Sequence, residues 1–183
     1  MARIRRAPRP PLPRFAVAWF PRFAGLDRVE AFRREHDPMA ALIPAHVSLV
    51  FPFATALKPL QVETHVRRVV SRWPVIPTSF RTVRIEANEF VFLMASRGAA
   101  AVTALHDALY TRSLRAHLRP EFPYAPHVTI ARHREFDRLE AAFDAARERF
   151  GHEMADTMRE VELLAVAPDG RIERLSTLPL DCA

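Results

Sequence analysis

The chain has few of the residues that several common enzyme classes require. Its one cysteine, Cys182, excludes an intramolecular disulfide and a thiolate metal cluster. Its four glycines, at positions 25, 98, 151 and 170, form neither a G-x-x-x-x-G-K phosphate loop nor a G-x-G-x-x-G dinucleotide fingerprint. The H-E-x-x-H and G-x-S-x-G motifs are also missing. We therefore expect an activity that needs no cofactor and no metal.

Long apolar segments are missing as well. No apolar run approaches the roughly 18 to 20 residues that span a bilayer, and the first residues lack the apolar centre of a secretory signal. With 183 residues, 49% of them hydrophobic, the chain is long enough for one substantial core or for two lobes that share one. We expect a soluble, cytoplasmic protein with no membrane partner.

Lysine is almost absent, because arginine supplies nearly all of the 27 basic residues. The formal net charge of +6 favours an anionic partner such as RNA or a nucleotide. Part of this excess lies in residues 1–13, where four arginines alternate with prolines. This composition predicts an extended tail, for which a solvated role is favoured over a phosphate-binding one.

Hydrophobic periodicity predicts the same order of elements twice: strand, helix, histidine-bearing strand, helix, strand. Turn and breaker residues separate the elements, and Asp169-Gly170 marks a hairpin between the last two strands. The predicted strands are 14–20, a segment from 46 onward, 78–85, 90–96, 124–132, 161–167 and 171–178, and the predicted helices are 26–36, 59–73, 99–118 and 136–150.

This repetition predicts an α+β domain over residues 14–183 with two pseudo-symmetric lobes. We expect each lobe to be a small, mainly antiparallel sheet with helices packed outside and an active-site cleft between the lobes. The lobes interleave and divide at approximately 14–86 and 87–183. A two-lobed chain needs no partner to complete such a site, so we expect a monomer.

The two histidine-bearing strands contain similar segments, PAHVSLVF at residues 44–51 and APHVTIAR at residues 125–132. In each, a histidine is followed two positions later by a hydroxyl residue. Alternate side chains of a strand share a face, so each segment places an imidazole about 7 Å from a hydroxyl. Two such strands in proximity would surround a phosphate with groups suited to acid/base chemistry.

Paired motifs of this kind, one in each half of a duplicated α+β chain, resemble the two-histidine (2H) phosphoesterase superfamily. Its members include RNA 2′,3′-cyclic phosphodiesterases and 2′-5′ RNA ligases. The resemblance implies that His46 and His127 are the catalytic acid/base pair and that Ser48 and Thr129 bind the phosphate of an RNA end or a nucleotide. Ser48 replaces the more usual threonine and keeps the hydroxyl.

Imidazole has an unperturbed pKa near 6.5 and serves as acid or base near neutral pH. Opening a cyclic phosphodiester needs both roles, and running the reaction in reverse exchanges them, so one architecture could serve hydrolysis or ligation. Which histidine is the base stays open at this point.

Three further residues are candidates for substrate contacts. Arg132 could hold a phosphate bidentately, although it would face away from His127 in a regular strand. Tyr124 and Phe51 could stack on a base, with a core position as the alternative for each.

Two alternatives remain for the motifs themselves. The histidines could be core or cross-strand residues whose neighbouring hydroxyls satisfy a hydrogen bond. The same basic cleft could also belong to a non-catalytic RNA-binding or nucleotide-binding protein.

Overall fold

A computed structural model of the chain describes residues 12–181. The tail predicted at 1–13 lies almost wholly outside the described residues, as does Cys182. Leu12 and Pro13 are described, are exposed and have no regular secondary structure.

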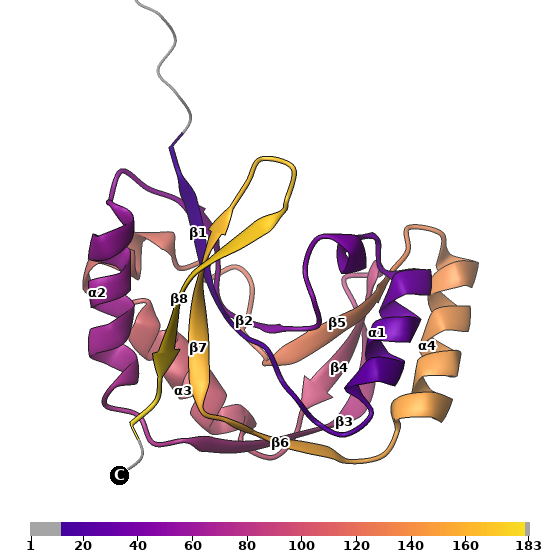
Figure 1. The fold of residues 1–183 in the computed structure, drawn as a ribbon. Helices are drawn as coiled ribbons and strands as arrows, with labels where there is room; N and C mark the ends of the chain where they lie inside the picture. Colours follow the sequence, from indigo (N-terminus) through magenta and orange to yellow (C-terminus); the bar gives the residue numbers. More distant parts are fainter. Residues whose placement is uncertain (1–11, 182–183) are drawn as a thin grey trace, which may run out of the picture.

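The fold contains two four-stranded sheets (Figure 1). The first has the order β2-β1-β7-β8 and the second the order β5-β4-β3-β6, and all neighbouring strands are antiparallel. These findings confirm the predicted α+β fold with two lobes. The strands are β1 (Arg14–Trp19), β2 (Val47–Ala54), β3 (Ile76–Glu86), β4 (Phe90–Ala95), β5 (His127–Arg132), β6 (Met154–Met158), β7 (Glu160–Val166) and β8 (Ile172–Pro179).

The division expected near residue 86 falls inside a hairpin. β3 and β4 pair with each other, and the turn between them places Ala87 and Asn88 at positive φ angles of 52° and 51°. The interleaving of the repeats is the cause. β3, the last strand of the first repeat, belongs to the second sheet. β7, from the second repeat, belongs to the first sheet.

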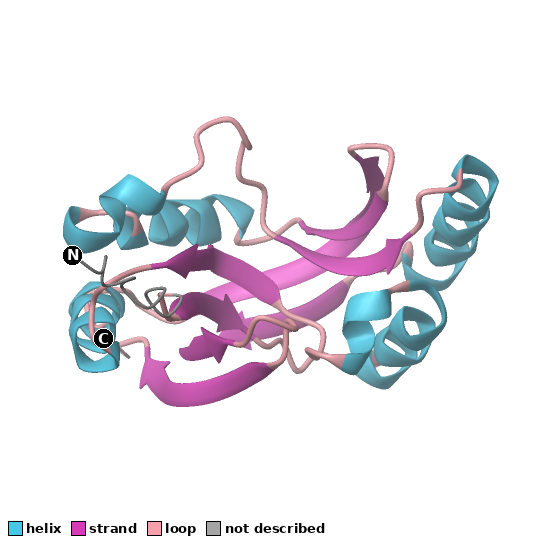
Figure 2. Cartoon of the chain, turned by 90° about the horizontal axis from the view of Figure 1, so that it is seen from above, coloured by secondary structure: helices cyan, strands magenta, loops and turns pink. Residues whose placement is uncertain are grey.

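Two helices cover each sheet (Figures 1 and 2). Two of the four helices pack against the sheet that holds the histidine-bearing strand of the other repeat. α1 follows β1 but packs against β5, and α3 follows β4 but packs against β2. Within residues 12–181, no helix is long and apolar enough to span a membrane. The helices are α1 (Leu26–His36), α2 (Pro59–Val70), α3 (Ala99–Leu109) and α4 (Phe136–Phe150), with short 3₁₀ helices η1 (Pro38–Ala41) and η2 (Arg112–His117).

Two local predictions need correction. The helix expected to reach residue 118 ends at Leu109, since Arg112 takes a left-handed φ of 46° and a 3₁₀ helix follows. The strand β6 was not predicted, because Met-Ala-Asp-Thr-Met is short and largely polar and lies at a sheet edge.

β5 begins at His127, whereas β2 begins at Val47, directly after His46. These two histidine-bearing strands, named for their motifs, each lie at the edge of a sheet, beside the first strand of the same repeat. β2 and β5 also contact each other, so these two edges meet in the middle of the molecule. The main core fills the space between sheets and helices, with Leu49, Leu105 and Ile130 fully buried. The core thereby holds the two motifs side by side.

Candidate active site

Both histidine-bearing strands contain a β-bulge at the same place in the motif. In β5 the extra residue is Ile130, and in β2 it is Leu49. A bulge inserts one residue and reverses the alternation of side chains beyond it. Two successive residues are therefore buried in each strand, and the next residue, Arg132 or Phe51, returns to the face of the hydroxyl. The prediction from a regular strand that Arg132 faces away is thus wrong.

The two imidazoles are held in the same way. His46 Nδ1 lies 2.8 Å from the carbonyl oxygen of Pro44, and His127 Nδ1 lies 2.7 Å from that of Ala125. A carbonyl oxygen only accepts, so Nδ1 carries the hydrogen and donates it in both rings. In the neutral imidazole this leaves Nε2 with a free lone pair. Each ring is therefore fixed in the tautomer that a general base requires.

Burial lowers the pKa of both histidines. It lowers the pKa of His127 to about 4, with a further reduction from the charge of His46 and an opposing contribution from the hydrogen bond to Ala125. Burial also lowers the pKa of His46, which is partly offset by the bond to Pro44. Both rings are consequently neutral in the free protein at pH 7, and the effect of His46 on the pKa of His127 is that of a neighbouring group.

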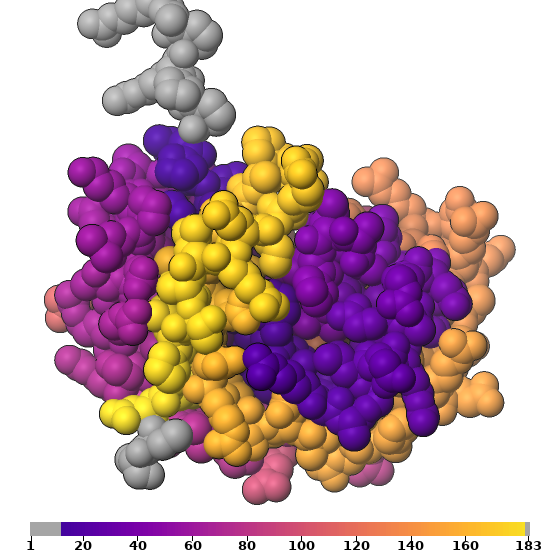
Figure 3. All heavy atoms as spheres, viewed as in Figure 1, coloured from indigo at the N-terminus to yellow at the C-terminus, as the bar shows by residue number. Residues whose placement is uncertain are grey.

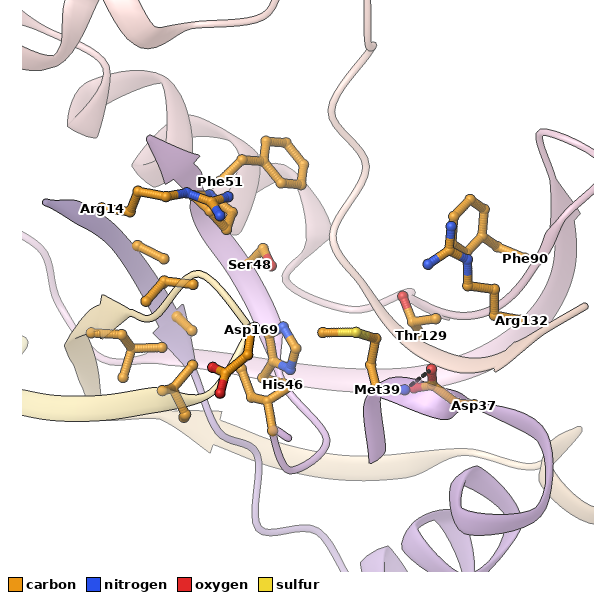
Figure 4. A pocket seen from close by; sticks show the side chains of 18 of the residues that line it. Arg14, Asp37, Met39, His46, Ser48, Phe51, Phe90, Thr129, Arg132 and Asp169 are labelled. Atoms are coloured by element: carbon orange, nitrogen blue, oxygen red, sulfur yellow. Dashed lines mark hydrogen bonds between the residues drawn. The ribbon is translucent and has the colours of Figure 1, made fainter. Parts of the chain in front are cut away.

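A cavity of about 670 Å³ lies where the two edges meet. Figure 4 shows His46 and Ser48 on one side of it and Thr129 and Arg132 on the other. The four side chains are thus brought together by elements from both repeats. His127 does not line this cavity itself. It lies beside it, on the same face of β5 as Thr129, with its ring stacked on Phe92 at a centroid distance of 3.6 Å.

Arg132 lines the cavity and is held at two points. Its Nε and Nη2 both lie 2.8 Å from Oε1 of Glu89, and its guanidinium carbon lies 5.1 Å from the centre of the Phe90 ring. The side chain is about one-third exposed. A guanidinium fixed in this way presents its remaining N–H donors to the cavity without a large loss of side-chain entropy.

The two aromatic candidates differ. Phe51 lines the cavity, as a base-stacking residue should. Tyr124 does not: its ring stacks on His106 at 3.7 Å, and its hydroxyl donates to the Ser48 carbonyl oxygen. Burial raises the pKa of this hydroxyl. We therefore withdraw Tyr124 as a base-stacking residue and assign it a structural role behind the site.

Sequence reasoning missed a buried ion-pair group beside His46. Arg33 is 1% exposed and donates to Asp37, to Glu30 and to the carbonyl oxygen of Ile43. Glu30 also accepts from the backbone N–H of Ala45. The group thus anchors the segment that leads into the motif. The helical spacing of Glu30, Arg33 and Asp37, on α1 and at its C-cap, was a signal, but exposed pairs have the same spacing.

Two strands related by a duplication, with one imidazole and one hydroxyl from each motif beside a common cavity, match the arrangement expected of two-histidine phosphoesterases. Residues 21–166 match the family described as the 2′-5′ RNA ligase superfamily. The chain belongs to this superfamily, which supports a phosphoesterase activity. No group of three or more potential metal ligands is found within residues 12–181.

Curated relatives agree with this assignment. A predicted phosphoesterase of Geobacillus thermodenitrificans is 27% identical over 90% of this chain and 87% of its own length. A second, from Bacillus pumilus, is 28% identical over 64% of this chain and 69% of its own length.

Solved structures share the fold. Apo LigT of E. coli has a TM-score of 0.63 and 18% identity, covering 92% of this chain and 98% of LigT. The protein TT0787 of Thermus thermophilus has a TM-score of 0.61 and 14% identity, covering 93% of this chain and 99% of its own. At these identities the likeness establishes the fold alone.

Proposed function

We propose that this protein opens a cyclic phosphodiester, namely the 2′,3′-cyclic phosphate of an RNA end or a small nucleotide, by two-histidine acid/base catalysis without a metal. One observation carries the proposal: both motif imidazoles donate Nδ1–H to a carbonyl two residues upstream, which leaves both Nε2 atoms for proton transfer. A core histidine would not need this arrangement twice at matching positions.

The chemistry follows from that geometry. One neutral imidazole takes a proton from water through Nε2 while the water oxygen attacks phosphorus. The bond from phosphorus to one ribose oxygen breaks, and the other imidazole, protonated at Nε2, gives its proton to that oxygen. The product is a phosphomonoester with one free hydroxyl. With the hydroxyl of a second RNA in place of water, the same two proton transfers give ligase activity.

The hydroxyls of Ser48 and Thr129 bind the non-bridging phosphate oxygens, and the guanidinium of Arg132 adds charge-assisted hydrogen bonds. The negative phosphate raises the pKa of the nearby imidazoles, so substrate binding itself favours the protonated acid. Of the two rings, His46 has the carboxylates of Asp37 and Glu30 nearby, although Arg33 opposes them. The two carboxylates beside His46 favour His46 as the acid and leave His127 as the base.

The nucleotide substrate is supported by the fold relatives, since E. coli LigT has been crystallised with 3′-AMP and with phosphate. The basic character of the chain, at a net charge of +6, is also suited to RNA.

Phosphorus NMR of a nucleoside 2′,3′-cyclic phosphate with the protein in EDTA tests the proposal. We expect ring opening by the wild type and a loss of about 10² to 10⁴ in rate for His46→Ala and for His127→Ala. The exposed His152, changed to alanine, is the matched control. Full activity in either motif variant, or salt-sensitive binding without turnover, would instead favour a binding protein.

A further inference from the structure

Each motif imidazole lies beside one phenylalanine ring. His127 stacks on Phe92, with 3.6 Å between the ring centroids and an angle of 13° between the planes. His46 lies beside Phe20, with 5.9 Å between the centroids and a tilt of 41°, which is within the range of aromatic contacts in proteins. Neither phenylalanine lines the cavity. Each ring therefore contacts its imidazole without contacting a substrate bound in the cavity.

An arginine lies over the ring beside His46. The guanidinium carbon of Arg174, on β8, is 4.6 Å from the centre of the Phe20 ring, which is a cation–π contact. Phe20 directly follows β1, so this contact joins the last strand of the chain to the segment between β1 and α1. In Figure 3 the yellow atoms of β8 lie beside indigo atoms of the N-terminal part of the chain.

A buried carboxylate holds this arginine in place. Glu162, on β7, is 4% exposed, and its Oε2 lies 2.7 Å from Nε of Arg174. Burial raises the pKa of Glu162, and among the charges nearby Arg174 opposes this rise most strongly. A buried carboxylate that loses its cationic partner is strongly destabilising. The ion pair therefore keeps the guanidinium over Phe20.

The second lobe contains a corresponding set of contacts. Glu89 binds Arg132, and the guanidinium carbon of Arg132 lies 5.1 Å from the centre of the Phe90 ring. The centre of that ring is 5.7 Å from the centre of Phe92, which stacks on His127. In both lobes a glutamate, an arginine and phenylalanine thus lead to the motif imidazole. Its occurrence twice argues against a chance surface contact.

The two arginines differ in their access to the substrate. Arg132 lines the cavity, whereas Arg174 does not. Arg174 is therefore not placed to bind the phosphate in this cavity, and its connection to the site is through Phe20. Phe20 also packs against the small cluster that includes Ala18 and Leu164. Together these contacts fix the ring on which His46 rests.

A fixed Phe20 ring affects His46 in two ways. The hydrogen bond from Nδ1 to the Pro44 carbonyl oxygen leaves the imidazole free to swing, and a neighbouring ring restricts this motion. The direction of Nε2 is thereby kept constant, which proton transfer requires. The ring also excludes water, and burial is the main reason that the pKa of His46 is lowered.

We infer that Phe20, fixed by the ion pair of Glu162 and Arg174, is a positioning residue for His46 and controls its direction and its exposure to water. The inference rests on the proposed function, because it assigns this role toward the acid of the same reaction. Phe20 and Arg174 touch no substrate, so their contribution belongs to kcat and to the pH dependence, and not to substrate binding.

Arg174→Gln tests the inference, because it removes the cation from a side chain that is 53% exposed. With a nucleoside 2′,3′-cyclic phosphate, kcat should fall about tenfold while KM stays within about twofold. The alkaline limb of kcat/KM should move to higher pH, since water reaches His46 and its pKa rises toward 6.5. Arg174→Lys keeps the cation and should restore most of the activity.

Arg147→Gln is the matched control, because Arg147 lies 5.5 Å from the centre of the Phe143 ring on α4 and neither residue lines the cavity. Phe20→Leu is a second variant, which keeps apolar volume and removes the ring. If Arg174 acts through Phe20, the double variant should be no slower than Phe20→Leu alone. Additive losses in kcat would overturn the inference.

An NMR titration of the histidines in the free protein separates this inference from the proposed function, because it needs no turnover. The other charged or titratable groups near His46 are unchanged in these variants: Arg33, Asp37, Glu30 and His127. The pKa of His46 should rise in Arg174→Gln and stay constant in Arg147→Gln.

The same rise in a protein that opens no cyclic phosphate would support the control of His46 by Phe20 and exclude the proposed function. An unchanged pKa of His46 and an unchanged alkaline limb in folded Arg174→Gln, with normal turnover by the wild type, would overturn the inference and leave the proposed function intact. A loss of stability alone would have the same meaning, since a purely structural role changes neither readout.

Discussion

The hydroxyl of Tyr124 donates a 3.0 Å hydrogen bond to the backbone carbonyl oxygen of Ser48. Tyr124 lies three residues before His127, so this bond joins the entrance of one motif to the hydroxyl residue of the other. A similar bond runs from the backbone N–H of Phe51 to the hydroxyl of Tyr110. Both tyrosines satisfy backbone groups of β2 at the edge of its sheet.

We expect Tyr124→Phe to destabilise the protein by about 0.5 to 1.5 kcal/mol, because the ring stacking remains and one hydrogen bond is lost. Its kcat should fall severalfold, since Ser48 is no longer tied to the segment before His127. Tyr110→Phe is the comparison: a similar loss of stability with a smaller effect on kcat. Urea unfolding and steady-state kinetics measure both, and an equal kcat in the two variants would contradict the positioning role.

The pH dependence follows from the lowered pKa values. The active form has one neutral and one protonated imidazole, and kcat/KM reports the pKa values of the free enzyme. The pKa of His127 is about 4, and the pKa of His46 is lowered from 6.5. Both pKa values lie below 6.5, so kcat/KM should already decline as the pH rises through 6.5 toward 7, because the single proton is lost.

The alkaline limb of kcat should lie at higher pH than that of kcat/KM, because the bound phosphate raises the imidazole pKa values. Both profiles are measured with one nucleoside 2′,3′-cyclic phosphate from about pH 4 to 8.5. A kcat/KM value that rises up to about pH 8 would be inconsistent with this assignment.

Arg132→Lys should lower kcat/KM by about 10- to 100-fold, corresponding to the loss of about 1.5 to 3 kcal/mol from a charge-assisted hydrogen bond. Lysine keeps the positive charge, but it lacks the planar guanidinium whose several N–H groups can bind Glu89 and a phosphate at the same time. Arg138→Lys is the control, because Arg138 forms an exposed ion pair with Glu135 on the surface. Equal kinetics for the two variants would remove Arg132 from the phosphate site.

Arg33→Met should destabilise the protein by about 3 to 5 kcal/mol, because it leaves the buried carboxylate of Asp37 without its partner. Arg67→Met breaks an ion pair of the same helical spacing with Glu63, at the surface, and should cost less than about 0.5 kcal/mol. Chemical unfolding compares them directly. A small effect of Arg33→Met would mean that the segment before His46 is held by packing alone.

The sequence was sufficient to predict the duplicated α+β plan and the pairing of the two motifs, because both depend on local periodicity. The side-chain directions beyond Thr129 and Ser48 were not predictable, because a bulge depends on the strand opposite. The sequence therefore could not establish on which face of its strand Arg132 lies. The packing of α1 and α3 was also hidden, since an amphipathic helix shows which face is apolar and not which sheet covers it.

The role of Tyr124 could not be predicted either. Its position near His127 is equally compatible with a substrate contact and with a bond to the neighbouring strand. Only the three-dimensional position of His106, which occupies one face of the Tyr124 ring, decides between them.

The exchange of α1, α3, β3 and β7 between the repeats has a consequence for how such a molecule could have originated. In one repeat alone, an apolar sheet surface would be exposed to solvent, because the first helix of the repeat packs against the sheet of the other repeat. Two separate copies could cover each other's sheets by swapping these elements, which would assemble both halves of the site at once. A half-length chain of this kind would therefore need a second copy both to bury its sheet and to complete the site.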